Sequence, residues 1–138
     1  MKRIALWVVV AAVTVTAACT DSNKYSTSPT QLALTGVFAG PVSGLVAAAP
    51  YSTGLTYTLT QTGNAVTGTW STALGNAGTV AGTVSGASVA FTLVQTAPCA
   101  GSVTGTATIS NNGMTLAGSY AGTMCGQALS ASFSVTRP

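Results

Sequence analysis

The chain has 138 residues and a formal net charge of +3, yet it holds only four Lys and Arg, one acidic residue and no His. Between positions 25 and 136, only Tyr and Cys side chains can ionise. General acid–base catalysis and zinc or calcium sites depend on His, Asp, Glu, Lys or clustered Cys. We therefore expect a protein that is not an enzyme and has no catalytic residue, metal ion or cofactor. Two of the basic residues are Lys2 and Arg3, so no basic surface for nucleic acid is predicted either.

Residues 1–18 have the pattern of an export signal. Lys2 and Arg3 precede an apolar run from Ile4 to Val15, which is shorter than the ~20 residues of a spanning helix. The T-A-A-C sequence that ends at Cys19 resembles the lipobox of bacterial lipoproteins, with Thr16 where that family prefers Leu. The resemblance implies a signal helix removed before Cys19, a diacylglycerol on the Cys19 sulfur and a further acyl chain, such as palmitate, on its amine. The alternative is an ordinary signal peptide followed by an incidental cysteine.

Residues 19–31 form the next segment, which is polar and lacks any apolar period. Such a composition is typical of a flexible tether. A tether suits a lipid-anchored protein better than a plain secreted domain. The expected location is therefore the bacterial cell envelope, with the outer membrane as the preferred site and the folded domain outside the cytoplasm. The membrane, reached through the N-terminal lipid, is the predicted partner.

Residues 32–138 are predicted to form one all-β domain. Leu55, Tyr57 and Leu59 alternate with threonines, which is the period of a half-buried strand. Short turns rich in Gly and Asn separate further segments of the same kind, and we count eight strands from Leu34 to Thr136. Eight short strands joined by tight turns predict an antiparallel up-and-down barrel, avidin-like or lipocalin-like, because closure removes the sheet edges. A two-sheet sandwich is the main alternative.

A strand type with a central glycine recurs five times along this domain, as LTGVF, VTGTW, VAGTV, VTGTA and LAGSY. Each glycine lies between two apolar residues on the same face. Because glycine weakens a strand, we expect these positions to allow tight coiling and to leave room for a large neighbour such as Trp70, Phe91 or Tyr120. The other face is rich in Thr and Ser. Regular T-x-T rows also occur on ice-binding surfaces, but those are flat and a small barrel is curved.

The segment AVTGTWSTALGNA, from Ala65 to Ala77, resembles the third strand and following loop of the avidin and streptavidin family. The resemblance implies an eight-stranded barrel with Trp70, Thr72 and Asn76 at ligand-contacting positions and Phe91 at the place of a pocket Trp. The family's first-strand Asn corresponds to Gly40, and no Asp follows Asp21 to match its late-strand Asp. The biotin site is therefore not retained.

An eight-stranded barrel has an interior just wide enough for side chains or one small ligand. The first hypothesis is a lipid-anchored barrel that holds a small apolar or weakly polar molecule. Its candidate lining residues are Phe38, Tyr57, Trp70, Phe91, Tyr120 and Phe133. The alternative is a structural or interaction module whose rings simply fill the core. A membrane-embedded barrel is disfavoured because one face carries Thr and Ser throughout and the predicted strands are shorter than the ~9–11 residues needed to span a bilayer.

Cys99 and Cys125 are the two cysteines left after Cys19, and we predict that they form a disulfide. Export places the domain in an oxidising compartment, where paired thiols persist. A hairpin centred on Asn112 would bring Cys99 and Cys125 face to face, since each lies 13 residues from that centre. A one-residue change in the turn would spoil this pairing but leave the bridge reachable through the flanking loops.

Overall fold

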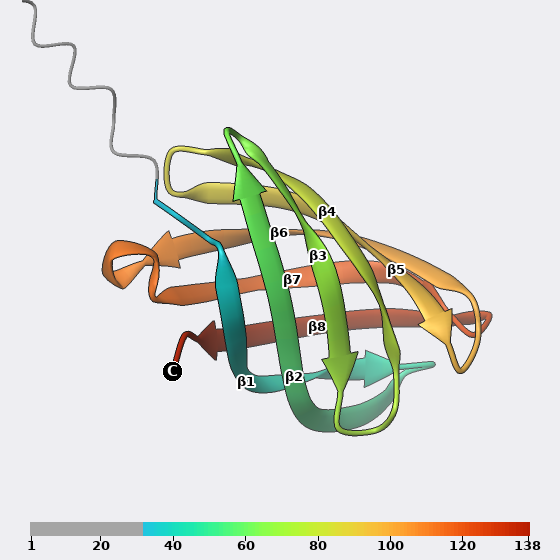
Figure 1. Cartoon of the computed structure of the whole chain (residues 1–138). Helices are drawn as coiled ribbons and strands as arrows, with labels where there is room; N and C mark the ends of the chain where they lie inside the picture. Colours follow the sequence, from blue (N-terminus) through green and yellow to red (C-terminus); the bar gives the residue numbers. More distant parts are fainter. Residues whose placement is uncertain (1–31) are drawn as a thin grey trace, which may run out of the picture.

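A computed structural model describes residues 32–138, which form a closed, all-β, antiparallel barrel (Figure 1). The strands are Gly36–Val46 (β1), Ala49–Thr62 (β2), Ala65–Thr72 (β3), Ala77–Ser85 (β4), Ser88–Ala97 (β5), Gly101–Ser110 (β6), Thr115–Met124 (β7) and Gln127–Thr136 (β8). Each strand pairs with its neighbours in sequence, and β1 pairs with β8 to close the sheet. The eight-stranded up-and-down barrel predicted from the sequence is confirmed. The predicted signal helix, Cys19 and the tether lie outside the described residues.

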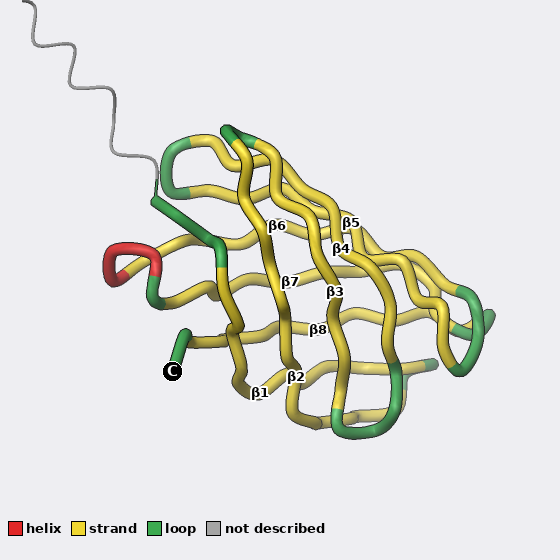
Figure 2. The backbone as a smooth tube through the Cα atoms, in the orientation of Figure 1, coloured by secondary structure: helices red, strands yellow, loops and turns green. Residues whose placement is uncertain are grey.

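Strands account for most of the described backbone (Figure 2). A single 3-10 turn, Asn111–Gly113 (η1), joins β6 to β7. No helix within residues 32–138 is long and apolar enough to cross a membrane.

The alternation of side chains explains which face of each strand points inward. In β8, Leu129, Ala131, Phe133 and Val135 are buried, whereas the serines between them are exposed. The same period places the Thr rows of β3 and β6 on the outside. Apolar residues at every second position therefore fill the barrel, and hydroxyl-bearing residues cover it.

The strands are longer than the sequence analysis expects. β2 has 14 residues, β1 has 11, and β5 to β8 have 10 each. The strand-length argument against a membrane-embedded barrel is therefore wrong, because these strands reach the length of about 9–11 residues that spanning strands have. The outward rows of Thr and Ser remain as the argument against it.

The repeated glycines on the inner face allow neighbouring strands to approach closely. A Cβ atom at Gly68 would collide with the Thr58 carbonyl oxygen on the adjacent strand. A Cβ atom at Gly105 would lie 2.7 Å from the Tyr120 Cβ and 2.9 Å from the ring of Phe91. Gly105 thus both permits tight coiling and makes room for large side chains, which are the two roles expected from the sequence.

One end of the barrel is sealed by the two ends of the described chain, and we call it the closed end. Leu34 is fully buried there, and its N–H donates to Gln61 Oε1 at 2.8 Å. The Arg137 guanidinium donates to the Ala33 carbonyl oxygen at 3.0 Å and lies 5.0 Å from the centre of the Phe38 ring. The segment before β1 therefore acts as a plug, held in place by the residue that follows β8.

The middle of the barrel is filled by aromatic rings. Phe133 contacts the rings of Tyr57, Phe91 and Tyr120, with centroid distances of 5.6, 5.8 and 5.9 Å. The cavity beside this cluster measures only about 20 Å³ and has an apolar lining. A space of this size has room for no more than about one water molecule, so the centre of the barrel is a packed core.

Candidate functional site

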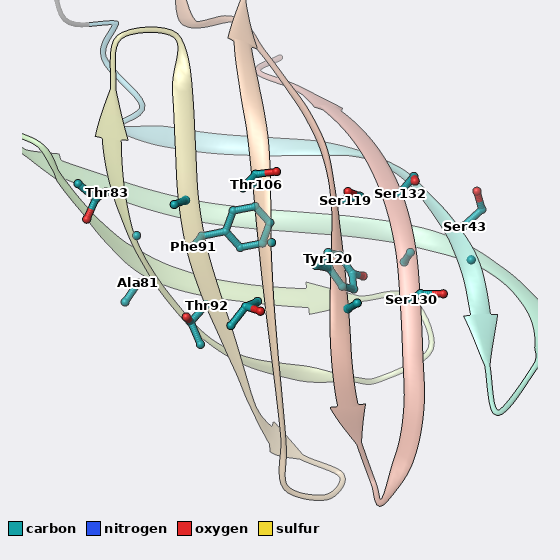
Figure 3. Close-up of a pocket in the computed structure, with 17 residues that line it drawn as sticks. Ser43, Ala81, Thr83, Phe91, Thr92, Thr106, Ser119, Tyr120, Ser130 and Ser132 are labelled. Atoms are coloured by element: carbon teal, nitrogen blue, oxygen red, sulfur yellow. The ribbon is translucent and has the colours of Figure 1, made fainter.

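Larger concave regions also occur among residues 32–138, and one of them is a wide hollow on the outer surface. It measures about 1070 Å³ and lies over β4 to β8 and the middle of β1 (Figure 3). Its lining is mainly short outward side chains, including Thr106, Ser119, Ser132 and Ser43, which pair in one row across four strands. The hollow is open and concave, unlike the flat faces that bind ice. Its size alone is a weak indication of a site, because none of the buried, unpartnered polar atoms found in residues 32–138 belongs to its lining.

The second concave region lies at the end of the barrel opposite the plug, and we call it the mouth pocket. It measures about 240 Å³. Its polar and aromatic lining consists of Tyr51, Trp70, Thr72, Asn76, Gln95, Tyr120 and Gln127, joined by Cys125 and the apolar side chains of Val46, Leu74, Met124 and Leu129. An apolar pocket with a few converging polar groups is the usual form of a small-molecule site. The mouth pocket is therefore the candidate site.

Trp70 presents an unused hydrogen-bond donor in this region. The side chain is only 3% exposed, and its indole Nε1 has no acceptor within residues 32–138. On the adjacent strand β2, Tyr57 is directly paired with Trp70, and its buried hydroxyl also lacks a partner in the described part of the chain. An unsatisfied buried polar group costs about 1–3 kcal/mol, so such groups are uncommon without a functional reason.

Gln95 presents an unused acceptor. It is 2% exposed, and its Nε2 donates to the Ala97 carbonyl oxygen at 3.1 Å and to Asn76 Oδ1 at 3.3 Å. A backbone carbonyl can only accept, so this contact fixes which end of the amide carries the hydrogens. The other end, Oε1, is buried and unpartnered among the described residues.

The β3–β4 loop forms one rim of the pocket. The Thr72 N–H donates to the Asn76 carbonyl oxygen at 2.8 Å, and the Asn76 N–H donates to Thr72 Oγ1 at 3.3 Å. These two bonds close the loop and leave Leu74 at its tip, 66% exposed. The loop thus holds Asn76 against Gln95 while presenting an apolar side chain to solvent at the pocket entrance.

Three tyrosines lie near one another at this level of the barrel. The hydroxyls of Tyr51 and Tyr120 are 3.4 Å apart. Burial raises the pKa of Tyr57, Tyr120 and Tyr51 above the ordinary value, and the mutual repulsion of ionised hydroxyls raises the pKa of Tyr57 and Tyr120 further. All three therefore stay neutral at physiological pH, and the pocket offers hydrogen bonds without charge.

The disulfide predicted from the sequence lies at this mouth. Cys99 and Cys125 are bonded, with their Cα atoms 5.3 Å apart, and they join the β5–β6 loop to the β7–β8 turn. The predicted hairpin register is wrong by one residue, since Gly101 pairs with Met124 and Ser110 with Thr115. Four residues separate the β6 and β7 strands, so the centre lies between Asn112 and Gly113. The bridge forms through the loops, and the Gln95 Nε2 lies 3.5 and 3.6 Å from its two sulfurs.

The residues singled out from the sequence divide between three places. Trp70, Thr72, Asn76 and Tyr120 line the mouth pocket together. Tyr57, Phe91 and Phe133 belong to the packed core, and Phe38 lies at the closed end beneath Arg137. Tyr51 and Gln95 also line the pocket and were not predicted from the sequence. Each lies an even number of residues from an inward-facing leucine on its own strand, Tyr51 from Leu55 and Gln95 from Leu93. The alternation of inward and outward side chains therefore indicated that both face inward.

Comparison with protein-family models and with curated proteins gives no match to this chain. Within residues 32–138, no group of three or more His, Cys, Asp or Glu side chains lies close enough to hold a metal ion. The chemistry of the mouth pocket is therefore interpreted from its own residues.

Proposed function

We propose that the protein is a non-enzymatic binding protein that takes up a small, weakly polar molecule in the mouth pocket. The observation that carries this proposal is that two of the side chains lining the pocket, Trp70 and Gln95, each hold a buried polar atom with no partner among residues 32–138, Trp70 Nε1 and Gln95 Oε1. Leaving each atom unsatisfied costs about 1–3 kcal/mol, and a ligand that bonds to both recovers part of this cost on binding. The volume of about 240 Å³ favours a molecule below the size of a typical drug.

The absence of catalysis in this proposal follows from the side chains at the site. Activation of a Ser or Thr hydroxyl needs a neighbouring base. The polar side chains that line the pocket are amides, hydroxyls and an indole, and the pKa of each pocket tyrosine is raised rather than lowered. Such groups orient and hold a ligand but do not move protons at neutral pH.

We further propose that a lipid on Cys19 anchors the protein to a bacterial envelope membrane, most naturally the outer membrane. The described chain begins at Leu32, beside the closed end, whereas the pocket opens at the other end. A lipid anchor would therefore join the barrel at the end away from the pocket and leave the mouth free to meet ligand. Two or more acyl chains give stable anchoring where one does not.

The anchor is tested by the intact mass of the protein purified from membranes. We expect a chain that begins at Cys19 and carries the mass of a diacylglycerol plus one acyl group. A chain cleaved elsewhere without lipid, or one that retains residues 1–18, would refute the anchor and leave the binding site unaffected.

The binding site is tested by native mass spectrometry of the purified protein and of two variants. Met124→Trp fills the mouth pocket, which Met124 lines, whereas the matched control Val94→Trp adds the same ring to the outer face of β5. We expect a bound small molecule in the wild type and in Val94→Trp, and none in Met124→Trp. Equal occupancy in all three proteins would place the ligand elsewhere.

The second candidate is a structural or interaction module without a small ligand. The packed centre of the barrel favours it, because the aromatic cluster leaves a cavity of only about 20 Å³. The outer hollow would then be the contact surface. This candidate gains support if no small molecule is found in the native protein and no neutral small molecule binds at the mouth.

A further inference from the structure

A single row of paired residues crosses the pocket wall. Trp70 on β3 pairs with Gly78 on β4, and Gly78 pairs with Gln95 on β5. Strands lie about 4.8 Å apart, so the backbones that carry the indole and the amide are separated by about 10 Å. Gly78 has no side chain to fill the space between them. A Cβ atom there would collide with the Val94 carbonyl oxygen and lie 2.9 Å from the Gln95 Cα.

A β-bulge follows immediately on β5. Ala77 pairs with Ala97 while Gly78 pairs with Gln95, so Thr96 is the extra residue. Both Thr96 and Ala97 are exposed, and Gln95 is therefore the last inward residue of the strand. Bulges often occur beside binding sites, where they interrupt the ladder and set the direction of a side chain. Gln95 thus lines the pocket with its amide next to the disulfide.

The polarity of the two free atoms is defined. An indole Nε1 can only donate, and the Gln95 Oε1 can only accept, because the Ala97 carbonyl oxygen holds the amide nitrogen. A ligand that satisfies both must bring an acceptor to Trp70 and a donor to Gln95. Water can bond to either atom, but it lacks an apolar body to cover the leucine, methionine and aromatic surface that lines the rest of the pocket.

The pocket also excludes formal charge. Arg137 is the charged side chain of the described residues, and it lies at the closed end with Phe38. The pocket tyrosines remain neutral at physiological pH because burial raises the pKa of Tyr51 and Tyr120. Burying an ion without a partner is far more costly than burying a neutral polar group that is hydrogen-bonded. A carboxylate or ammonium inside this pocket would find no opposite charge.

We propose, on the basis of the function proposed above, that the ligand is an uncharged molecule with a carboxamide-type donor and acceptor on an apolar body. Its acceptor bonds to Trp70 Nε1, its donor bonds to Gln95 Oε1, and its apolar body rests on the pocket's apolar side chains. Gln95 is the residue that determines specificity. Asn76, Ala97 and the disulfide position its amide and present Oε1 to the ligand.

The test uses four probes of similar size in calorimetric titrations of the purified full-length protein. Benzamide offers a donor and an acceptor, acetophenone an acceptor alone, ethylbenzene neither, and benzoate a charge. For the wild type we expect benzamide to bind at least about tenfold more tightly than benzoate, because the carboxylate must be desolvated without a partner.

Two variants then assign the two hydrogen bonds. Gln95→Met removes the acceptor at nearly constant volume, and we expect the preference for benzamide over acetophenone to fall about three- to tenfold, which corresponds to one neutral hydrogen bond. Trp70→Phe removes the indole donor, and we expect the preference for acetophenone over ethylbenzene to fall by a similar factor. Comparing ratios between proteins cancels the different hydrophobicity of the probes. Val94→Met, on the outer face of β5, is the control and should leave both ratios unchanged.

The outcomes separate the ligand class from the function itself. If the probes bind but both ratios stay the same in the two variants, the carboxamide class is overturned and the mouth pocket survives as a binding site. If the native protein carries no small molecule and none of the four probes binds, the proposed function is overturned. Should Gln95→Met fail to fold, as judged by circular dichroism, the Trp70→Phe ratio and the benzoate comparison still decide the matter.

Discussion

The two ends of the barrel are built from the same strands, but they differ in whether their buried polar groups have hydrogen-bond partners. At the closed end, the Gln61 side-chain oxygen accepts from the Leu34 N–H, and the Gln61 backbone N–H donates to Thr35 Oγ1 at 3.0 Å. The Arg137 guanidinium donates to the Ala33 carbonyl oxygen. Of the buried side-chain nitrogen and oxygen atoms described at this end, only Arg137 Nε lacks a hydrogen-bond partner.

At the mouth, two side chains that line the pocket, Trp70 and Gln95, hold a buried indole donor and a buried amide acceptor without partners among residues 32–138. Strand sequence alone does not account for this difference, because the inner faces of both ends follow the same alternation. One end is closed by the chain's own backbone and side chains. The other leaves a buried donor and a buried acceptor unused, which supports the proposed ligand site there.

The largest contrast between the two ends should appear in stability. Leu34→Ala removes a fully buried plug and should lower the free energy of unfolding by about 2–5 kcal/mol. Leu74→Ala, at the exposed tip of the β3–β4 loop, should change it by no more than about 0.5 kcal/mol. Urea denaturation of the two variants measures both values. Equal losses would show that the plug is not part of the cooperative core.

The disulfide should matter for both stability and the pocket. Its cysteines are 26 residues apart, so the chain-entropy model gives about 3–4 kcal/mol for the double variant Cys99→Ser/Cys125→Ser. The melting temperature should fall on the order of 15–20 °C. Benzamide affinity should fall as well, because Gln95 Nε2 contacts both sulfurs.

A simple labelling experiment checks the bond itself. Alkylation of the denatured, unreduced protein should leave Cys99 and Cys125 unmodified, and alkylation after reduction should label both. Label on both residues without reduction would contradict the bridge.

The dependence of stability on pH should be confined to alkaline conditions. The pKa values of Tyr51, Tyr57 and Tyr120 are raised in the folded state, so their contribution is fully present below pH 10, the ordinary value, and is lost as the pH rises above it. Each tyrosine that ionises only on unfolding should lower the free energy by about 1.4 kcal/mol per pH unit. Denaturation curves from pH 5 to 11 should therefore be flat up to about pH 9 and decline beyond pH 10. A decline in the free energy of unfolding between pH 5 and 8 would point to a titrating group outside residues 32–138.

The smallest effect is expected with biotin. The mouth pocket has Trp70, Thr72 and Asn76 at positions implied by the avidin resemblance, but it has no acidic partner, since no Asp follows Asp21. We expect a dissociation constant no tighter than about 1 µM. Calorimetric titration measures it. A dissociation constant of about 1 nM or below would mean that the missing acid is replaced by another group in the pocket.

The barrel could be predicted from the sequence because the alternation of inward and outward side chains can be recognised within each single strand. Alternation in segments such as Ala128–Thr136 defines an inner and an outer face, and short turns leave few ways to connect the strands. The hairpin register failed by one residue for an equally local reason. Asn111 and Asn112 both have positive φ values, of 51° and 55°, and Gly113 has 84°, and the turn takes up four residues, which moves its centre past Asn112.

The candidate site was harder to predict because it depends on contacts between distant segments. Gln95 follows Val89, Phe91 and Leu93 at every second position of β5. This alternation could have shown that Gln95 faces inward. It could not have shown that a bulge ends the strand there, or that Ala97 and the disulfide fix the amide, because these features arise only when β4, β5 and two loops come together.

The most direct test is to determine which concave surface binds the probe, by following backbone amide and indole signals in NMR spectra during addition of benzamide. Loss of one indole signal in Trp70→Phe assigns it. We expect a saturable shift of the Trp70 indole and of the Gln95 and Asn76 signals, with Thr106, Ser119 and Ser132 in the outer hollow unchanged. Shifts confined to the outer hollow, with the Trp70 indole unmoved at saturating benzamide, would contradict a ligand site at the mouth.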